Sequence, residues 1–190
     1  MSTNIKKLTL GGVCAIALSL GFGLDAQAGG PYGFGSNASA ADIAKIDIDV
    51  MPDGRGAPAG SGTYAQGKKV YAATCAACHG ADMAKPVKGT GAAPLRGGRG
   101  TLTSGKPKKT VESYWPYAST LFDYTKRSMP FNAPGSMTDN DIYAVVAYIL
   151  AEGKIISKDT VMNAKTLASV RMPNRDGFIS DPRPDIFNYD

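Results

Sequence analysis

Two cysteines and a histidine stand together in the pentapeptide Cys75-Ala76-Ala77-Cys78-His79. Two thiols at this spacing, followed directly by an imidazole, are typical of covalent haem attachment, in which the thiols bond the haem vinyl groups and the imidazole binds the iron. A redox dithiol or half of a zinc site would use the same residue types. The chain has one histidine, and its third cysteine is Cys14, so thiolates and imidazoles cannot complete a four-ligand zinc site. The motif predicts one covalently bound haem c held by Cys75, Cys78 and His79.

The second axial ligand of the iron must come from elsewhere in the chain. Without another histidine, the choices are methionine, lysine or an open position, and methionine is favoured for a redox haem. A methionine is more often core filling than a ligand, and Met83 lies too close to His79 to reach the opposite haem face. Met129 precedes Pro130, which bars helix continuation. The methionines of the mature chain are Met51, Met83, Met129, Met137, Met162 and Met172.

Two amphipathic helices are predicted to position these residues. From Ser61 onward, Tyr64, Gly67, Tyr71 and Cys75 recur at steps of three or four, so one helical stripe leads into the pentapeptide. The second helix spans Asp139 to Glu152, with an apolar face at Ile142, Val145, Val146, Ile149 and Leu150. Thr138 is the expected N-cap and Gly153 the terminator of this helix. We expect an all-α domain whose haem site lies at a helix end.

With the haem motif between two such helices, the chain from about Gly60 to Lys154 resembles class I cytochromes c. The resemblance implies that the two helices cross where Gly67 and Tyr71 meet the face around Ala147 and Tyr148. It implies Met129 as the second iron ligand, with Met137 and then Met172 as alternatives. It also implies that Pro94 and Leu95 support the imidazole and cover the haem edge, with the Pro94 carbonyl as acceptor for His79 Nδ1. Trp115 falls where such proteins place a haem-pocket aromatic, and core packing is an equal interpretation.

The ends of the chain predict an exported protein with flanking extensions. Lys6 and Lys7 precede the apolar run Leu8 to Leu24, and Ala26-Gln27-Ala28 follows, as in a cleaved signal peptide. The run falls short of the roughly 20 residues needed to span a bilayer, so we expect no membrane span after cleavage and a periplasmic location. The predicted organisation is a signal peptide at 1–28, an extended leader at 29–60, a cytochrome c domain at 61–154 and an extended tail at 155–190. Within the leader, the alternation of Ile43, Ile46, Ile48 and Val50 indicates a short strand-like stretch.

Positive charge is concentrated in the middle of the chain. Residues 81–127 hold nine basic and three acidic side chains, whereas the leader and the part after Ser128 are each about −2. Part of this charge would balance the haem propionates, and part would be ordinary solvated surface. A positive rim beside the haem edge would also steer an acidic redox partner. Nucleic acid is a poor partner for an exported haem protein without a uniformly basic surface.

The tail narrows the resemblance. Segments 172–178 and 181–185 are rich in proline and turn-forming residues, which indicates an extended tail without a long helix. Together with Trp115-Pro116-Tyr117 and Arg127-Ser128-Met129-Pro130-Phe131, the tail is similar to the haem c subunits of bacterial sulfite dehydrogenases and of the Sox-type sulfur dehydrogenase. In those systems a molybdenum-cofactor subunit passes electrons to the cytochrome, and this chain carries one haem motif.

The resemblance therefore implies periplasmic electron transfer, with a molybdenum-cofactor sulfite dehydrogenase subunit as donor and a downstream cytochrome or oxidase as acceptor. The chain would not be catalytic alone. A general electron shuttle between other partners is the alternative, although a minimal shuttle would not need the tail. An enzyme with an open sixth iron position is disfavoured, because no distal histidine is available for acid and base chemistry.

Overall fold

The computed structural model describes residue 32 and residues 34–179. The predicted signal peptide and the end of the predicted tail lie outside the described residues. The chain forms two units, the first ending at Ile43 and the second beginning at Ala44, so the division falls inside the first helix. The second unit contains everything that bears on the haem motif.

Helix α1 spans Ala40–Ile46, where the sequence had indicated a strand-like stretch, and that prediction is wrong. Ser39 Oγ accepts a hydrogen bond from the Asp42 N–H at 3.2 Å and donates one to the Asp42 carboxylate at 2.6 Å, which caps the helix. The helix also contains three alanines, the residue with the highest helix propensity. Beyond it, Val50 is buried in the core, and its N–H donates to Asp123 Oδ1 at 3.0 Å.

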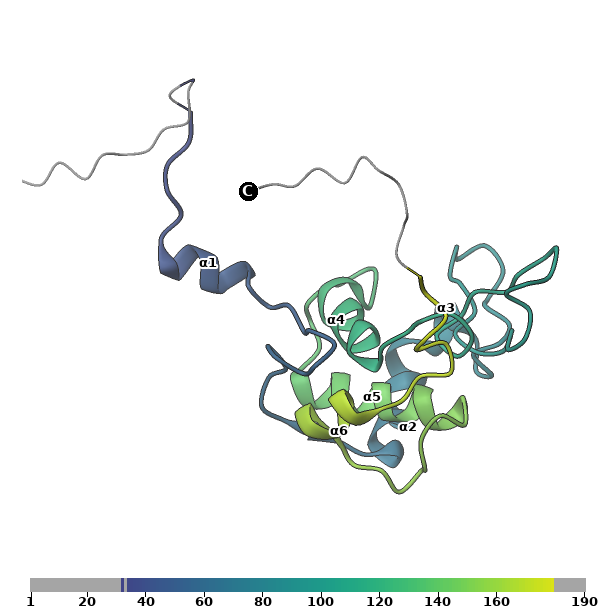
Figure 1. Ribbon diagram of the computed structural model, residues 1–190. Coiled ribbons are helices and arrows are strands. Elements are labelled where there is room, and N and C mark those ends of the chain that lie inside the picture. The colour runs from purple at the N-terminus through teal and green to yellow at the C-terminus, as the bar shows by residue number, and fades with distance from the viewer. Residues whose placement is uncertain (1–31, 33, 180–190) are drawn as a thin grey trace, which may run out of the picture. The chain divides into compact units, whose positions relative to one another are not determined.

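The second unit is built around helices α2 (Tyr64–Thr74) and α5 (Asp139–Glu152), which cross in the core (Figure 1). Helix α5 has the predicted bounds, with the Thr138 hydroxyl accepting from the Asp141 N–H and Gly153 at the C-cap. Its residues from Ile142 to Ala151 are all buried, because α2, α4 and the strands surround it. Helix α2 begins with a capping box between Thr63 and Gln66.

The predicted glycine contact between the two helices is present, and the residues nearest to Gly67 are Ala144 and Tyr148, where Ala147 and Tyr148 had been expected. A Cβ atom on Gly67 would lie 1.8 Å from the Ala144 carbonyl oxygen and 2.8 Å from Tyr148 Cβ, so only glycine permits this approach. The Tyr71 and Tyr148 rings pack beside it, with centroids 5.4 Å apart. This crossing places α2 against the central helix, and the pentapeptide follows at the C-terminal end of α2.

Helix α4 (Ala118–Ser128) packs Leu121, Phe122 and Thr125 into the core and ends at Met129. Residues 80–117 between the pentapeptide and α4 form turns and loops. In the part of the chain that the structure describes, no helix is long and apolar enough to cross a membrane.

The tail contributes two short elements to the same unit. Strand β2 (Met162–Asn163) pairs antiparallel with β1 (Ser61–Gly62), with Gly62 opposite Met162. Helix α6 (Ala164–Ser169) follows, capped by Asn163. Met162, Leu167 and Met172 are at most 1% exposed and belong to the core. The mostly helical architecture agrees with the all-α prediction, to which the structure adds a two-stranded ribbon.

Candidate haem site

The pentapeptide occupies the junction of two helices. Helix α2 ends at Cys75, whose N–H donates to the Tyr71 carbonyl at 2.9 Å, and the single turn α3 (Ala76–His79) follows directly. Cys75 is half-buried against the core, and Cys78 is exposed; both are free thiols. Burial raises the pKa of the Cys75 thiol. The two thiols and the imidazole are thus presented within one helical turn.

The His79 ring is oriented by a backbone carbonyl, but not by the predicted one. Nδ1 lies 2.9 Å from the Ala93 carbonyl oxygen, whereas Pro94 had been expected to supply the acceptor. A carbonyl can only accept, so Nδ1 carries the proton and Nε2 is left as the nitrogen that can bind a metal. The acceptor belongs to the peptide bond that joins Ala93 to Pro94, so the predicted proline supplies the fixed backbone angle beside it rather than the oxygen.

Met83 holds the loop that carries this carbonyl. Its carbonyl oxygen accepts both the Leu95 N–H at 2.8 Å and the Arg96 N–H at 3.2 Å. Met83 has a φ of 60°, a left-handed conformation that is uncommon for a non-glycine residue, and its side chain is 1% exposed. The sequence excluded Met83 as an iron ligand on the ground of its spacing, and in the structure it is a core residue.

The other methionines differ sharply in their surroundings. Met162 and Met172 are buried in the core, and Met137 packs against the edge of the core. Met129 is half-buried at the C-terminal end of α4, where its N–H donates to the Thr125 carbonyl at 3.1 Å. Met51 is 42% exposed. Met172, one of the alternatives to Met129, therefore already has a packing role.

Leu95 and Trp115 both lie half-buried against the core. The Trp115 ring meets the Tyr124 ring edge-on, with centroids 5.7 Å apart, and the Tyr124 side chain is 45% exposed. Leu95 follows Pro94, two residues from the carbonyl that His79 contacts. These residues provide apolar and aromatic surface of the kind that a haem ring needs.

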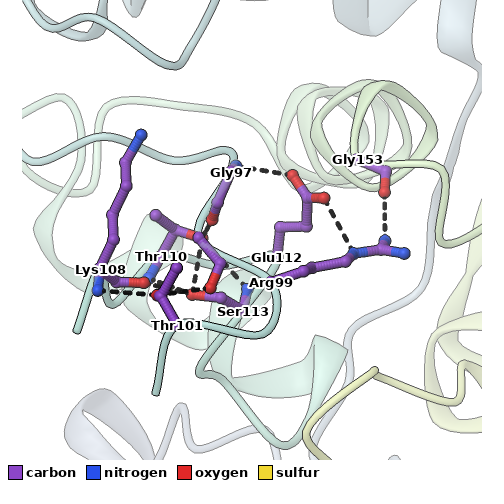
Figure 2. Close-up of polar contacts among 9 residues, drawn as sticks. Gly97, Arg99, Thr101, Lys108, Thr110, Glu112, Ser113 and Gly153 are labelled. Atoms are coloured by element: carbon purple, nitrogen blue, oxygen red, sulfur yellow. Dashed lines mark hydrogen bonds and ion pairs between the residues drawn. The ribbon is translucent and has the colours of Figure 1, made fainter. Parts of the chain in front are cut away.

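Sequence reasoning missed a polar network in the loop between Leu95 and Trp115. Glu112 accepts from the Gly97 N–H and forms an ion pair with Arg99, which in turn donates to the Gly153 carbonyl at the end of α5 (Figure 2). The opposite charges of Arg99 and Glu112 were visible in the sequence. Their pairing was not, because it depends on how a glycine-rich loop folds back on itself.

The donor set fits a covalently attached haem. Two free thiols and a histidine with an unshared Nε2 stand at a helix end, and half-buried apolar side chains lie on the loops that follow. Among residues 34–179 and residue 32, no group of three or more His, Cys, Asp or Glu side chains is arranged to hold a metal ion. The prediction of a haem site therefore depends on the two cysteine thiols and the His79 imidazole. These are the groups through which proteins bind haem c.

A glycine-mediated crossing of the first and last domain helices, with a Cys-x-x-Cys-His turn at the end of the first, defines a class I c-type cytochrome, and the chain belongs to this family. The family model described as cytochrome c matches residues 64–152. The family implies a covalently bound haem c.

Two proteins that the chain is similar to are dehydrogenases of sulfur compounds. A chain in the crystal structure of the sulfane dehydrogenase SoxCD from Paracoccus pantotrophus is 38% identical, with a TM-score of 0.72, and the match covers 80% of this chain and 74% of that one. A thiosulfate dehydrogenase from Stutzerimonas stutzeri (strain A1501) is 32% identical over 93 residues, which is 48% of this chain and 28% of that protein. The chain thus matches well under half the length of that curated relative. It is homologous to cytochromes of sulfur dehydrogenases, which confirms the predicted resemblance.

Proposed function

We propose that this chain is a single-haem c-type cytochrome of the periplasm that accepts electrons from a molybdenum-dependent sulfite or sulfur dehydrogenase. The observation that carries the proposal is the match to a SoxCD chain over 80% of the sequence, well beyond the cytochrome c domain. The predicted signal peptide supports the location, and the one Cys-x-x-Cys-His motif supports a single haem.

In this proposal each site residue has one task. Cys75 and Cys78 would tether the haem, and His79 and Met129 would be the two protein ligands of its iron. Pro94, Leu95 and Trp115 contribute the wall around it and exclude water, which disfavours the added positive charge of the oxidised state. The bound haem c supplies a one-electron couple between the ferric and ferrous states.

Exposed lysines beside the pentapeptide offer a docking surface for an acidic partner. Four of the nine basic side chains in residues 81–127 are ion-paired within the chain: Arg96, Arg99, Lys126 and Arg127. Lys85 and Lys88 are exposed and flank Val87, whose N–H donates to the Cys78 carbonyl at 2.9 Å. Their charge therefore lies next to the haem attachment point, where it can accelerate association with a negative surface.

The test is reduction of the oxidised cytochrome by a molybdenum-dependent sulfite dehydrogenase and sulfite, followed by haem absorbance. We expect reduction faster than that of an unrelated c-type cytochrome, with a rate that falls as salt is added. The double variant Lys85→Glu/Lys88→Glu should be reduced more slowly at low salt, whereas the exposed Lys165→Glu on α6 is the matched control. Equal rates for this protein and the unrelated cytochrome would favour the general electron shuttle.

A further inference from the structure

The loop that carries the Ala93 carbonyl is anchored at three successive backbone N–H groups. Those of Leu95 and Arg96 donate to the Met83 carbonyl, and that of Gly97 donates to Glu112 Oε2 at 2.7 Å. The first acceptor, the Met83 carbonyl, lies four residues after His79 in the chain. The second acceptor, Glu112, is linked through Arg99 to the end of the central helix α5.

Glu112 connects this loop to α5 through Arg99 (Figure 2). While Oε2 accepts from Gly97, Oε1 accepts from Arg99 Nε at 2.8 Å, and Arg99 Nη2 donates to the Gly153 carbonyl. The Glu112 side chain is 15% exposed and that of Arg99 is 44% exposed, so the carboxylate is shielded although the guanidinium is partly in solvent. Charge-assisted hydrogen bonds are stronger than neutral ones. The far end of this ion pair is fixed to the most deeply buried helix of the unit.

Residues 108–113, which follow later in the same loop, contribute further hydrogen bonds to it. Thr110 Oγ1 donates to the Gly97 carbonyl at 2.7 Å, and Ser113 Oγ donates to the Lys108 carbonyl at 2.7 Å. Gly98 has a φ of +87°, and a Cβ atom there would lie 2.3 Å from the Lys108 carbonyl oxygen. Both peptide groups of Gly97 are therefore bonded to the segment that carries Glu112.

We propose that Arg99 and Glu112 are positioning residues for His79. They tie Gly97, four residues after Ala93, to the end of α5, and this sets where the Ala93 carbonyl meets Nδ1–H of the imidazole. The inference rests on the proposed role of His79 as an iron ligand. It adds that two residues distant from His79 set the orientation of its imidazole ring. Neither residue needs to touch the haem to act in this way.

The direction of the effect follows from the hydrogen bond. A strong Nδ1–H bond to a carbonyl gives the imidazole more anionic character and makes it a better donor to the metal. A better donor stabilises the ferric state, so the bond lowers the reduction potential. Releasing the loop weakens the bond and should shift the potential upward.

The experiment compares the purified haem-loaded full chain with Arg99→Ala and Glu112→Gln. Arg171→Ala is the matched control, because Arg171 forms an ion pair with Asp176 in which both side chains are about three-quarters exposed. The two readouts are the reduction potential and the solvent exchange rate of the His79 Nδ1 proton by NMR. We expect both variants to shift the potential upward and to accelerate exchange, with Arg171→Ala matching wild type.

Unchanged potential and exchange in both loop variants would overturn the proposal, even if their thermal stability fell. Should Arg99→Ala fail to yield haem-loaded protein, Arg99→Lys replaces it, since one ammonium cannot serve both Glu112 and Gly153 with the geometry of a guanidinium. A smaller shift in the same direction is then expected, and no shift would again count against the proposal. Failure of the proposed function is seen separately, as a wild-type spectrum without a histidine-ligated haem.

Discussion

At the scale of single residues, the methionines of this chain differ in burial. Met83, Met162 and Met172 are at most 1% exposed and fill the core. Met129 is half-buried at the end of α4, followed by a proline that ends the helix. Because Met129 is not enclosed in the core, its burial is compatible with the proposed role as iron ligand, and the partly buried Met137 stays the alternative.

We therefore predict that Met129→Ala abolishes the weak long-wavelength absorption band of sulfur-to-iron ligation while the haem stays attached. The attachment survives because Cys75 and Cys78 hold the haem independently of Met129. The measurement is the absorption spectrum of the oxidised protein, with Met137→Ala as the matched control. If the band persists in Met129→Ala and disappears in Met137→Ala, the ligand is Met137.

Glu152 predicts a pH dependence of stability. The Tyr64 hydroxyl, which donates to Oε1 at 2.7 Å, lowers the pKa of this carboxyl, with further contributions from Lys158 and Arg96. A carboxyl whose pKa is lower in the folded than in the unfolded state stabilises the fold above its unfolded pKa and loses this contribution as the pH falls through the folded value.

The variant Glu152→Gln should accordingly lower the free energy of unfolding by about 1 kcal/mol near neutral pH. The difference from wild type should vanish in acid, below the lowered pKa, because both side chains are then uncharged. Urea unfolding at several pH values measures both effects, and Asp176→Asn in an exposed ion pair is the control. A difference that is constant with pH would show that the charge of Glu152 does not contribute.

The haem-binding motif could be recognised in the sequence because cysteine and histidine are rare in this chain. With one histidine in the chain, the Cys75–His79 motif could not be part of a zinc site, and covalent haem attachment was favoured over a redox dithiol. The Ala93 carbonyl and the Glu112 bridge were not predictable, since every residue offers a carbonyl and many loops carry glutamate. Backbone acceptors become specific only when the fold brings them to a side chain.

At the scale of elements, the crossing of α2 and α5 depends on backbone approach. Gly67 and Gly62 both lie where a Cβ atom would overlap atoms of Ala144. Both obstructing groups include backbone atoms within a helix that is buried along most of its length, so they cannot move aside cheaply. The short distance between α2 and α5 is thus possible only because glycine has no side chain at these positions.

Gly67→Ala should lower the free energy of unfolding by about 3 kcal/mol through overpacking. Gly105→Ala is the matched control, because a Cβ atom there would meet nothing within 4 Å. Chemical denaturation of the two variants measures the difference. Equal stability of Gly67→Ala and wild type would mean that the helices can separate without loss of packing.

The sequence predicted α5 correctly and α1 wrongly, and the difference lies in how well the local sequence signals agree with one another. In α5 a cap, a terminator and an apolar face all agree, and the helix is long enough for its period to be recognised. Around α1, the apolar residues Ile43, Ile46, Ile48 and Val50 combine a helical step of three with an alternation of two, so their spacing alone does not decide between helix and strand. The Ser39 cap and the alanines decided in favour of a helix, and the sequence interpretation gave them too little weight.

At the scale of the whole molecule, the tail completes the core instead of merely following it. Leu167 on α6 is 1% exposed, and α6 contacts α4. Further along, Asn174 Nδ2 donates to the Tyr114 carbonyl at 2.7 Å, and the Arg175 guanidinium lies 4.1 Å from the centre of the Tyr117 ring. The tail thus reaches the segment that contains Trp115. These contacts join residues that are far apart in the chain, so no local sequence pattern predicts them. The sequence therefore indicated only a tail rich in turns.

We predict that Leu167→Ala lowers the free energy of unfolding by about 2–5 kcal/mol, as expected for truncation of a buried leucine. Val161→Ala, in the same tail but with a side chain 46% exposed, is the control and should change little. Thermal unfolding of the haem-loaded protein followed by far-UV circular dichroism compares them. Equal melting temperatures for the two variants would mean that the tail adds nothing to the stability of the core.

The ribbon of β1 and β2 has a consequence for how the chain is made. Gly62 stands just before α2, and its partner Met162 is translated about a hundred residues later. During synthesis, Cys75 and Cys78 therefore emerge long before the last pieces of the interior arrive. The core to which Met162 and Leu167 belong is therefore completed only after this last segment has been made.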